Sequence, residues 1–233
     1  MVSKILEKII LISGGSDGLG LATAKVLNKE NTVVILSPKK EKCKEVKKYF
    51  DIDYVVADIT KESEVEEAVK NVIKKYGRID ALINNAGIWI EGNLEDNEYK
   101  TIKEVFEVNV LGAINLTQKV IPYMKKIKRG RVVNVVSQAG LYPKAERSVY
   151  HASKYALRGF TDSIAIELAP FGIAVSGFYP DKMNTNFFAK AGCKKDMKNY
   201  IEVDEAVRAI EFIVETSENL NIPELGIKNI GEY

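Results

Sequence analysis

A tyrosine and a lysine four positions apart, Tyr150 and Lys154, have the spacing of a general acid/base pair. They open a stretch with helical periodicity, in which residues i and i+4 share one face, so the ammonium can approach the phenol oxygen. A free tyrosine has a pKa near 10, and bringing it within reach of neutral pH takes about 3–4 kcal/mol. One unit charge about 4 Å away, at an effective dielectric constant near 20, supplies about that much. We therefore expect Lys154 to lower the pKa of Tyr150, with Ser137 as a third polar group directly after an apolar run.

A glycine-rich turn follows the first apolar run of the chain, residues 9–12. It reads Ser13-Gly-Gly-Ser-Asp-Gly-Leu-Gly20 and leads into a helical pattern. Glycines at a strand-to-helix turn let the backbone approach a pyrophosphate, which the positive end of the helix attracts. The alternative is a turn that needs only positive φ, because Gly14-x-x-x-Gly18-x-Gly20 is not the generic GxGxxG pattern.

The same turn also matches the nucleophile elbow of serine hydrolases, with Ser16 at its centre and His151 as the base. A hydrolase needs strands before the elbow to supply its oxyanion loop, and only about a dozen residues precede this one. Its acid and histidine also normally follow near the end of the chain. The hydrolase therefore remains a remote alternative.

The elements that must position these residues follow an alternating pattern. Short runs rich in Ile and Val predict strands near 8–13, 32–36, 53–57, 79–83, 131–136, 172–178 and 225–230. Amphipathic stretches predict helices near 18–28, 41–49, 61–76, 98–107, 110–127, 150–169 and 203–215. This alternation is typical of βαβ units, so we expect a doubly wound α/β fold, a seven-stranded parallel sheet with helices on both faces.

No linker or change of composition divides residues 1–233, which predicts a single domain. The least regular stretch, 180–202, follows the sixth strand. Because ligands bind at the carboxyl ends of strands in such sheets, we expect this stretch to be a mobile substrate lid.

Composition excludes several other classes of protein. The chain has 46% hydrophobic and 28% charged residues with a formal net charge of +2, and acids and bases are interleaved, which gives no support to nucleic-acid binding. Its two cysteines are far apart and its only histidine is His151, so we expect neither a disulfide framework nor a metal site. The apolar run at 9–12 is too short for a signal peptide or a membrane span, and we expect a cytoplasmic protein.

Four motifs in order resemble the short-chain dehydrogenase/reductase family, in its single-domain branch, over essentially the whole chain. The family motif TGxxxGxG is similar to residues 13–20, with serine in place of threonine, and its NNAG motif stands intact at 84–87. The catalytic asparagine matches Asn109, and Ser137 and the YxxxK motif match with the thirteen-residue gap that the family usually shows. On its own YxxxK is more often a packing aromatic with a solvated lysine. The other motifs in register favour catalysis.

The resemblance implies a Rossmann-type domain that transfers a hydride between a nicotinamide and a carbonyl or alcohol carbon. Tyr150 would donate or accept the hydroxyl proton, and Lys154 would lower its pKa and bind the nicotinamide ribose. Ser137 would bind the substrate oxygen, and Asn109 would hold the water through which Lys154 reaches solvent protons.

The resemblance also assigns cofactor contacts. The positions are Ser13, Gly14, Ser16, Gly18, Leu19, Gly20, Ser37, Lys39, Asp58, Ile59, Asn85, Ala86, Gly87, Tyr150, Lys154, Pro180 and Thr185. Asp58 would bind the adenine; taken alone it would be a loop or capping carboxylate. Asp181 departs from the family, which has glycine after this proline.

The cofactor preference depends on the end of the second strand. Ser37 is neither the acidic residue that would repel a 2′-phosphate nor the arginine that would bind it. Lys39 or Lys40 could pair with that phosphate, whereas Asp17 in the glycine turn would oppose it. We expect NADP(H) to be favoured slightly over NAD(H), by at most about tenfold.

Aromatic residues at strand ends predict an apolar substrate pocket made by Trp89, Tyr142, Phe187 and Phe188, although some of them could be ordinary core residues. His151 points about 100° away from Tyr150 on the helix, and we expect it to be structural or on the surface.

The partners that we expect are a small carbonyl or alcohol substrate and a second copy of the chain. The resemblance implies a dimer through the helices at 110–127 and 150–169. The family's tetramer contact is uncertain, because the glycine-rich tail after the last strand is missing. The alternative function is a non-catalytic protein that binds or senses a dinucleotide. Such a protein has no need of all four residues Asn109, Ser137, Tyr150 and Lys154.

Overall fold

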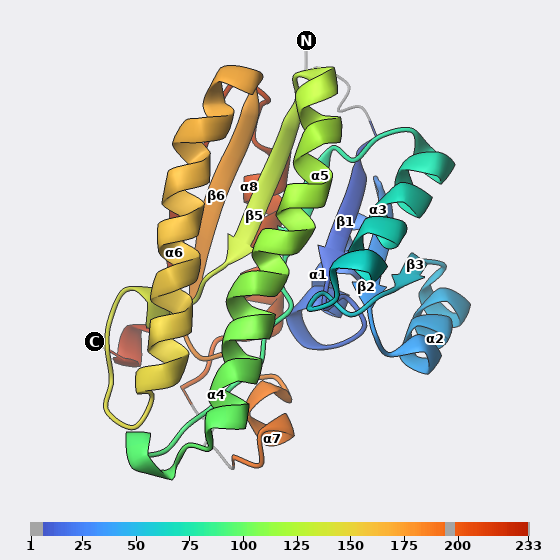
Figure 1. The fold of residues 1–233 in the computed structure, drawn as a ribbon. Helices are drawn as coiled ribbons and strands as arrows, with labels where there is room; N and C mark the ends of the chain where they lie inside the picture. Colours follow the sequence, from blue (N-terminus) through green and yellow to red (C-terminus); the bar gives the residue numbers. More distant parts are fainter. Residues whose placement is uncertain (1–6, 194–198, 233) are drawn as a thin grey trace.

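The computed structural model describes residues 7–193 and 199–232, and within them seven strands form one parallel sheet (Figure 1). The strands are β1 (Ile9–Ser13), β2 (Thr32–Ser37), β3 (Asp53–Val56), β4 (Ala81–Asn84), β5 (Gly130–Val135), β6 (Ile173–Pro180) and β7 (Glu224–Ile227). Their order is β3-β2-β1-β4-β5-β6-β7, so the direction of winding reverses between β1 and β4. The predicted doubly wound sheet is confirmed. A crevice at the carboxyl ends of strands beside such a reversal is where these folds bind ligands.

Helices cover both faces of the sheet (Figure 1). They are α1 (Gly18–Leu27), α2 (Lys40–Phe50), α3 (Glu62–Tyr76), α4 (Tyr99–Phe106), α5 (Ala113–Ile127), α6 (Ser148–Leu168), α7 (Phe187–Lys190) and α8 (Val203–Glu215). Alternate strand residues pack on opposite faces: Ile9 and Leu11 belong to the core under α3, α5 and α6, whereas Ile10 and Ile12 belong to the core under α1, α2 and α8. The two cores fix the sheet between its helices.

The helix between 99 and 127 differs from the prediction of two separate helices. α4 continues through a π-helical segment, Glu107–Gly112, directly into α5. Segments of this kind are frequent at functional sites, and this one contains Asn109. The last strand is also shorter than the predicted 225–230, because β7 ends at Ile227 and a short 3₁₀ helix follows at Ile230–Glu232.

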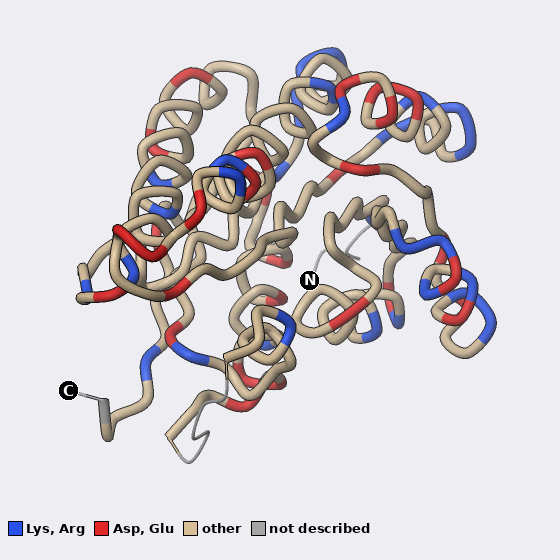
Figure 2. The backbone as a smooth tube through the Cα atoms, turned by 60° about the horizontal axis from the view of Figure 1, so that its bottom comes forward, with Lys and Arg blue, Asp and Glu red and all other residues tan. Residues whose placement is uncertain are grey.

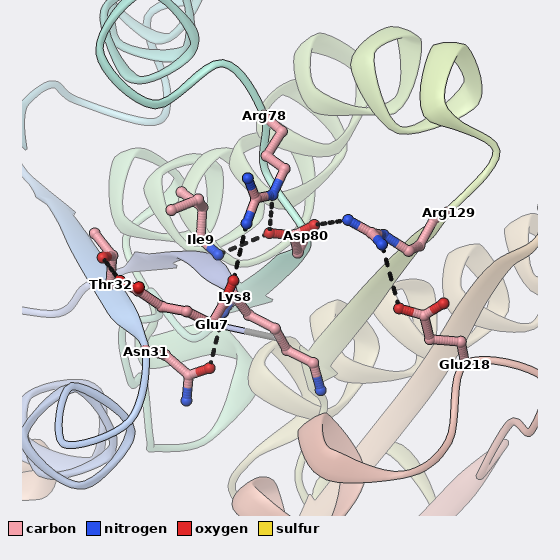
Figure 3. A network of polar contacts seen from close by, with 9 residues as sticks. All are labelled: Glu7, Lys8, Ile9, Asn31, Thr32, Arg78, Asp80, Arg129 and Glu218. Carbon is pink, nitrogen blue, oxygen red and sulfur yellow. Dashed lines mark hydrogen bonds and ion pairs between the residues drawn. The ribbon is translucent and has the colours of Figure 1, made fainter. Parts of the chain in front are cut away.

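Asp80 ties together the opposite end of the sheet, before β4 (Figure 3). Its carboxylate accepts hydrogen bonds from Ile9 N at 2.8 Å, Arg78 Nε at 2.8 Å and Arg129 Nη2 at 2.9 Å. Arg129 also pairs with Glu218 at 3.5 Å. With an exposed fraction of only 8%, Asp80 links the starts of β1 and β4 to the segments before β5 and after α8.

The surface carries both signs of charge. Figure 2 shows Lys and Arg interspersed with Asp and Glu along the helices, without a face of one sign. Among the described residues, no helix has the length and apolar character needed to cross a bilayer.

Candidate functional site

The glycine turn after β1 is held against the loop after β4 by hydrogen bonds. Ser13 Oγ accepts from Asn85 N at 3.1 Å and from Ala86 N at 3.2 Å, and Asn85 Nδ2 donates to Ser13 O at 3.1 Å. A serine serves here because one hydroxyl oxygen can accept from both amides. The glycine turn (13–20) and the NNAG segment (84–87) are therefore held together at the point where the winding of the sheet reverses.

Two glycines of the turn leave no room for a side chain. Gly14 has φ of +65°, and a Cβ atom there would lie 2.9 Å from Ala86 Cα. A Cβ atom at Gly20 would lie 2.4 Å from Asn85 Nδ2 and 2.5 Å from Gly14 O. Glycine at both positions lets the helix start and the loop after β4 approach each other.

Asp17 caps α1 and connects it to two other elements. Its carboxylate accepts from Gly18 N at 2.8 Å and pairs with Lys42 Nζ at 2.9 Å and Lys190 Nζ at 2.8 Å. Burial acts to raise the pKa of Asp17, but the hydrogen bonds from Lys190 and Lys42 outweigh it and hold the pKa well below its ordinary value. Because Lys190 belongs to α7, the 180–202 stretch is joined to the glycine turn.

Ser16 lies away from His151. Ser16 Oγ is 2.9 Å from Ser37 Oγ, and Lys39 N donates to the same Ser37 oxygen at 3.2 Å. His151 instead makes a hydrogen bond with the backbone of Ala139. Within the described residues there is no serine–histidine pair of the kind that a hydrolase needs.

Tyr150 and Lys154 lie on one face of α6 and are both buried. Tyr150 has an exposed fraction of 4% and shares a hydrogen bond with Ser137, and Lys154 Nζ donates to Val135 O at 3.0 Å with an exposed fraction of 5%. The Lys154 nitrogen lies 5.8 Å from the centre of the Tyr150 ring. The three residues that the sequence singled out therefore meet at the carboxyl end of β5.

The expectation that the pKa of Tyr150 falls is wrong for this structure. Burial raises the pKa of Tyr150 well above its ordinary value, and the hydrogen bond with Ser137 lowers it by less. Burial also lowers the pKa of Lys154 to about 8. Both shifts favour the neutral forms, because removing water disfavours a charge more than the neighbouring groups restore it.

Ser137 holds an unusual backbone conformation, with φ of +90° and ψ of 154°. A residue with a side chain rarely adopts this region, and the cost is about 1–3 kcal/mol. The conformation is fixed by Ser137 N, which donates to Phe178 O at 3.1 Å, and by Gly140 N, which donates to Ser137 O at 2.9 Å. Strain of this kind is typical of functional sites.

Asn109 supports the loop after β4 from the π-helical segment. Its Oδ1 accepts from Ile88 N at 2.8 Å, while its Nδ2 donates to Ile88 O at 3.0 Å and to Ser153 Oγ at 3.1 Å. The side chain therefore joins this loop to α6 beside Lys154. Its expected role in holding a water remains a prediction.

A cavity of about 560 Å³ runs from the glycine turn to Tyr150. The residues predicted to bind cofactor, substrate or proton that line it are Gly14, Ser16, Gly18, Leu19, Ser37, Lys39, Asp58, Ile59, Asn85, Ala86, Gly87, Trp89, Ser137, Tyr142, Tyr150, Lys154, Pro180, Thr185, Phe187 and Phe188. Three further predicted residues support the wall without lining it, namely Ser13, Gly20 and Asn109.

Asp58 has the structural contacts of a turn as well as its place in the cavity wall. Its Oδ1 accepts from Thr60 N at 3.0 Å and from Thr60 Oγ1 at 2.8 Å. Both interpretations of this carboxylate, as a turn residue and as a cofactor contact, are compatible with that position.

The expected aromatic residues gather around Tyr150. The Trp89 ring lies 4.4 Å from the Tyr150 ring and 4.9 Å from the Phe188 ring, measured between centroids, and Phe187 is 6.3 Å from Trp89. Tyr142 lies at the margin of the cavity, with an exposed fraction of 59%. One end of the cavity is therefore apolar and lies beside Tyr150.

A family model described as short chain dehydrogenase matches residues 8–196. The chain belongs to the short-chain dehydrogenase family. It is 36% identical over 184 residues to the 3-oxoacyl-[acyl-carrier-protein] reductase of Thermotoga maritima, over 76% of this chain and 75% of that protein. It is 34% identical over 180 residues to the 3-ketodihydrosphingosine reductase of Bacteroides thetaiotaomicron, over 77% of this chain, and the match spans 65% of that relative's length.

Solved structures give the same result. The 3-ketoacyl-(acyl-carrier-protein) reductase from Brucella melitensis complexed with NADH superimposes with a TM-score of 0.87 at 29% identity, over 97% of this chain and 98% of that one. ElxO with NADP bound superimposes with a TM-score of 0.85 at 26% identity, over 95% of this chain and 98% of that one. The dehydrogenase is thus an NAD(P)-dependent oxidoreductase.

Sequence reasoning missed several residues of the dehydrogenase's cavity. Arg147, Met183 and Tyr200 also line it, and Lys190, another lining residue, pairs with Asp17. Arg147 lies just before the helix that carries the YxxxK motif, so its position in the sequence could have marked it as a candidate for the cavity wall. His151, expected to be structural or on the surface, is buried and lines the cavity.

Proposed function

We propose that the dehydrogenase transfers a hydride between a nicotinamide cofactor and a carbonyl or secondary alcohol, with Tyr150 as the general acid/base. The observation that supports this most strongly is the buried hydrogen bond between Tyr150 and Ser137, with Lys154 on the same helix face. The two curated relatives compared above are reductases of keto compounds by name. We propose reduction as the direction of the reaction.

The described residues fit a dinucleotide. The cavity extends from the start of α1, where backbone N–H groups are available to an anion, to the acid/base residue. The nicotinamide ring would supply the hydride. Asn85, Ala86, Gly87, Pro180 and Thr185 also line this cavity.

Ser137 and Tyr150 would act on the carbonyl oxygen of the substrate. Ser137 orients it by a hydrogen bond, and Tyr150 donates the proton as negative charge develops on the oxygen. Because burial raises its pKa, Tyr150 holds its proton at neutral pH and is ready to act as an acid. The Lys154 ammonium would stabilise the tyrosinate that the transfer leaves behind.

The test is a screen of NADPH and NADH oxidation with ketones, sugars, steroids and acyl thioesters, followed by Tyr150→Phe on any substrate that it finds. We expect the variant to lose at least about a hundredfold in kcat, the scale of general acid catalysis, while it still binds cofactor. Tyr155→Phe is the matched control, since Tyr155 lies on the same helix with its hydroxyl on Leu141 O at 2.7 Å. Tyr150→Phe activity within about threefold of wild type would contradict the assignment.

We propose that NADP(H) is bound slightly more tightly than NAD(H). Lys39 lines the cavity beside Ser37, and the charge of Asp17 is compensated by Lys42 and Lys190. An exposed lysine contributes only about 0–1 kcal/mol, so the advantage is at most about tenfold. The advantage should shrink as salt rises and vanish in Lys39→Ala. Tighter binding of NADH than of NADPH at low salt would refute this preference.

We also propose a homodimer that works in the reducing cytoplasm. The helices expected at the interface carry exposed apolar side chains, among them Leu111, Tyr155 and Ile166. Cys43 and Cys193 are not joined in a disulfide. Light scattering should give twice the chain mass, and Ile166→Glu should shift it toward the monomer.

A further inference from the structure

Two lysines pair with the same oxygen of Asp17, and one of the two borders the cavity. Asp17 Oδ2 lies 2.9 Å from Lys42 Nζ and 2.8 Å from Lys190 Nζ, while Asp17 Oδ1 accepts from Gly18 N. Lys190 lines the cavity from α7, whereas Lys42 belongs to α2 and lies outside the cavity wall. The ammonium of Lys190 is therefore held at the start of α1, beside the space that a cofactor would occupy.

The start of α1 carries a surplus of positive charge. One carboxylate and two ammonium groups meet there, which leaves one cation in excess. The first turn of α1 holds no acidic residue, and the peptide dipoles of the helix add positive potential at this end. A pyrophosphate carries a negative charge on each phosphate, so the surplus ammonium and the helix end favour the same ligand.

Asp17 keeps partners for both of its oxygens when Lys190 leaves. Lys42 still pairs with Oδ2, and Gly18 N still donates to Oδ1. The Lys190 side chain has an exposed fraction of 45%, and an ion pair this exposed changes an equilibrium by a factor of about five at most. An ammonium bound to a phosphate makes a stronger, charge-assisted hydrogen bond. Exchange of the carboxylate for a phosphate is therefore favourable.

The backbone that carries Lys190 is anchored independently of Asp17. Phe188, two residues earlier, has an exposed fraction of 7%. Its ring lies 4.9 Å from the Trp89 ring and 5.8 Å from the Tyr200 ring, measured between centroids. Because lysine has a flexible four-carbon stem, its ammonium can change partner while α7 stays in place.

We propose that Lys190 is a ligand of the cofactor's pyrophosphate, and that its ammonium exchanges the Asp17 carboxylate for a phosphate oxygen when a dinucleotide binds. Asp17 holds the lysine beside the phosphate site in the free enzyme and stays paired with Lys42 afterwards. NADH and NADPH share the pyrophosphate, so Lys190 contributes to the affinity for both and not to the choice between them. This inference rests on the cofactor site of the proposed function and is independent of the reaction.

The test is calorimetric binding of NADH, NADPH and ADP-ribose at low salt, without substrate. ADP-ribose keeps the pyrophosphate and lacks the nicotinamide. We expect Lys190→Met to bind all three probes at least about fivefold more weakly, with factors that agree within about twofold. Lys190→Arg should stay within about twofold of wild type, because a guanidinium also binds phosphate.

Lys42→Met is the matched control for the loss of an ammonium. Lys42 pairs with the same Asp17 oxygen as Lys190 but lies outside the cavity wall. We expect this variant to change the affinity for each probe by no more than about twofold. An equal loss in Lys42→Met and Lys190→Met would mean that only the net charge at the start of α1 matters, and would overturn the proposal.

Asp17→Asn separates an exchange of partners from a permanent ion pair. Asparagine is also a good N-cap for α1, but it has no charge to hold Lys190. If Lys190 changes partner on binding, the variant binds NADH at least as tightly as wild type, because nothing competes for the ammonium. If the pair with Asp17 persists in the complex, the variant binds NADH more weakly, and the proposal is wrong.

The remaining outcomes distinguish this proposal from the proposed function. A loss in Lys190→Met confined to NADPH would place the lysine at the 2′-phosphate and overturn the proposal. Unchanged binding of all three probes by Lys190→Met would refute the proposal alone. A wild type that binds none of the probes would refute the proposed cofactor site together with it. Binding with the expected losses but no turnover of any ketone would support the role of Lys190 and refute the reductase assignment.

Discussion

Replacing Lys154 by methionine should abolish catalysis and yet make the protein more stable at neutral pH. Lys154 is buried, and its ammonium donates a hydrogen bond to the carbonyl oxygen of Val135 at 3.0 Å. Methionine fills a similar volume without a charge. The cost of the buried ammonium then disappears from the folded state, as expected when a functional group is maintained against stability.

The size of the effect follows from the pKa of Lys154, which burial lowers from 10.5 to about 8. At 1.36 kcal/mol per pKa unit this corresponds to roughly 3 kcal/mol. Losing the hydrogen bond to Val135 O takes back about 1–1.5 kcal/mol. We expect a net gain of about 1–2 kcal/mol in the free energy of unfolding, or about 2–8 °C in Tm for a chain of this size.

The gain should depend on pH in a defined direction. Below about pH 8 the lysine is protonated in both states, so the wild type carries the full cost of burying the charge. Between pH 8 and 10.5 the unfolded chain binds more protons than the folded one, so the wild type becomes more stable relative to Lys154→Met. Above about pH 10.5 the lysine is neutral in both the folded and the unfolded state, so the charge no longer contributes to the stability difference between wild type and Lys154→Met.

Urea unfolding of both proteins at about pH 7 and about pH 10 measures this difference directly. The exposed Lys100→Met is a matched control and should change stability by no more than about 0.5 kcal/mol at either pH. A Lys154→Met variant that is less stable than wild type at pH 7, or a gain that stays constant up to pH 10, would refute the reasoning.

Three further predictions concern other parts of the molecule. Asp80→Ala should lower the free energy of unfolding by about 2–4 kcal/mol in urea unfolding, because it leaves the backbone N–H of Ile9 without its acceptor and removes the carboxylate partner that Arg78 and Arg129 share, whereas the exposed Glu66→Ala should change it by less than about 0.5 kcal/mol; a loss below about 1 kcal/mol would show that Asp80 is dispensable. Gly20→Ala should weaken NADPH binding at least about tenfold in a fluorescence titration, because the added methyl meets Asn85, and unchanged affinity would contradict the close approach at the turn. Cofactor should slow hydrogen exchange in 180–202 more than elsewhere, and equal exchange with and without cofactor would argue against a lid.

Part of the lid prediction can be compared with the structure. Residues 180–202 contain a short helix, α7, and a bridge between Met183 and Ile201, while residues 194–198 lie outside the described part of the chain. The pairing of Lys190 with Asp17 could not be predicted, because the two residues are far apart in the sequence and no local pattern links them. The sequence predicts that Asp17 opposes the binding of a phosphate. In the structure its carboxylate forms ion pairs with Lys42 and Lys190.

The sequence by itself determined the architecture of the sheet and located the three polar residues that meet at the carboxyl end of β5. Periodicity located the strands and helices because each buries a face set by its own repeat, and the motifs located Ser137, Tyr150 and Lys154 because their spacing is local. Only the tertiary structure decided the electrostatics and the surroundings. The pKa shifts of Tyr150 and Lys154 come from water excluded by segments distant in the chain, and the same burial brought Arg147 and His151 into the cavity wall with polar atoms unpaired. Spacing places two groups side by side, but desolvation depends on everything packed around them.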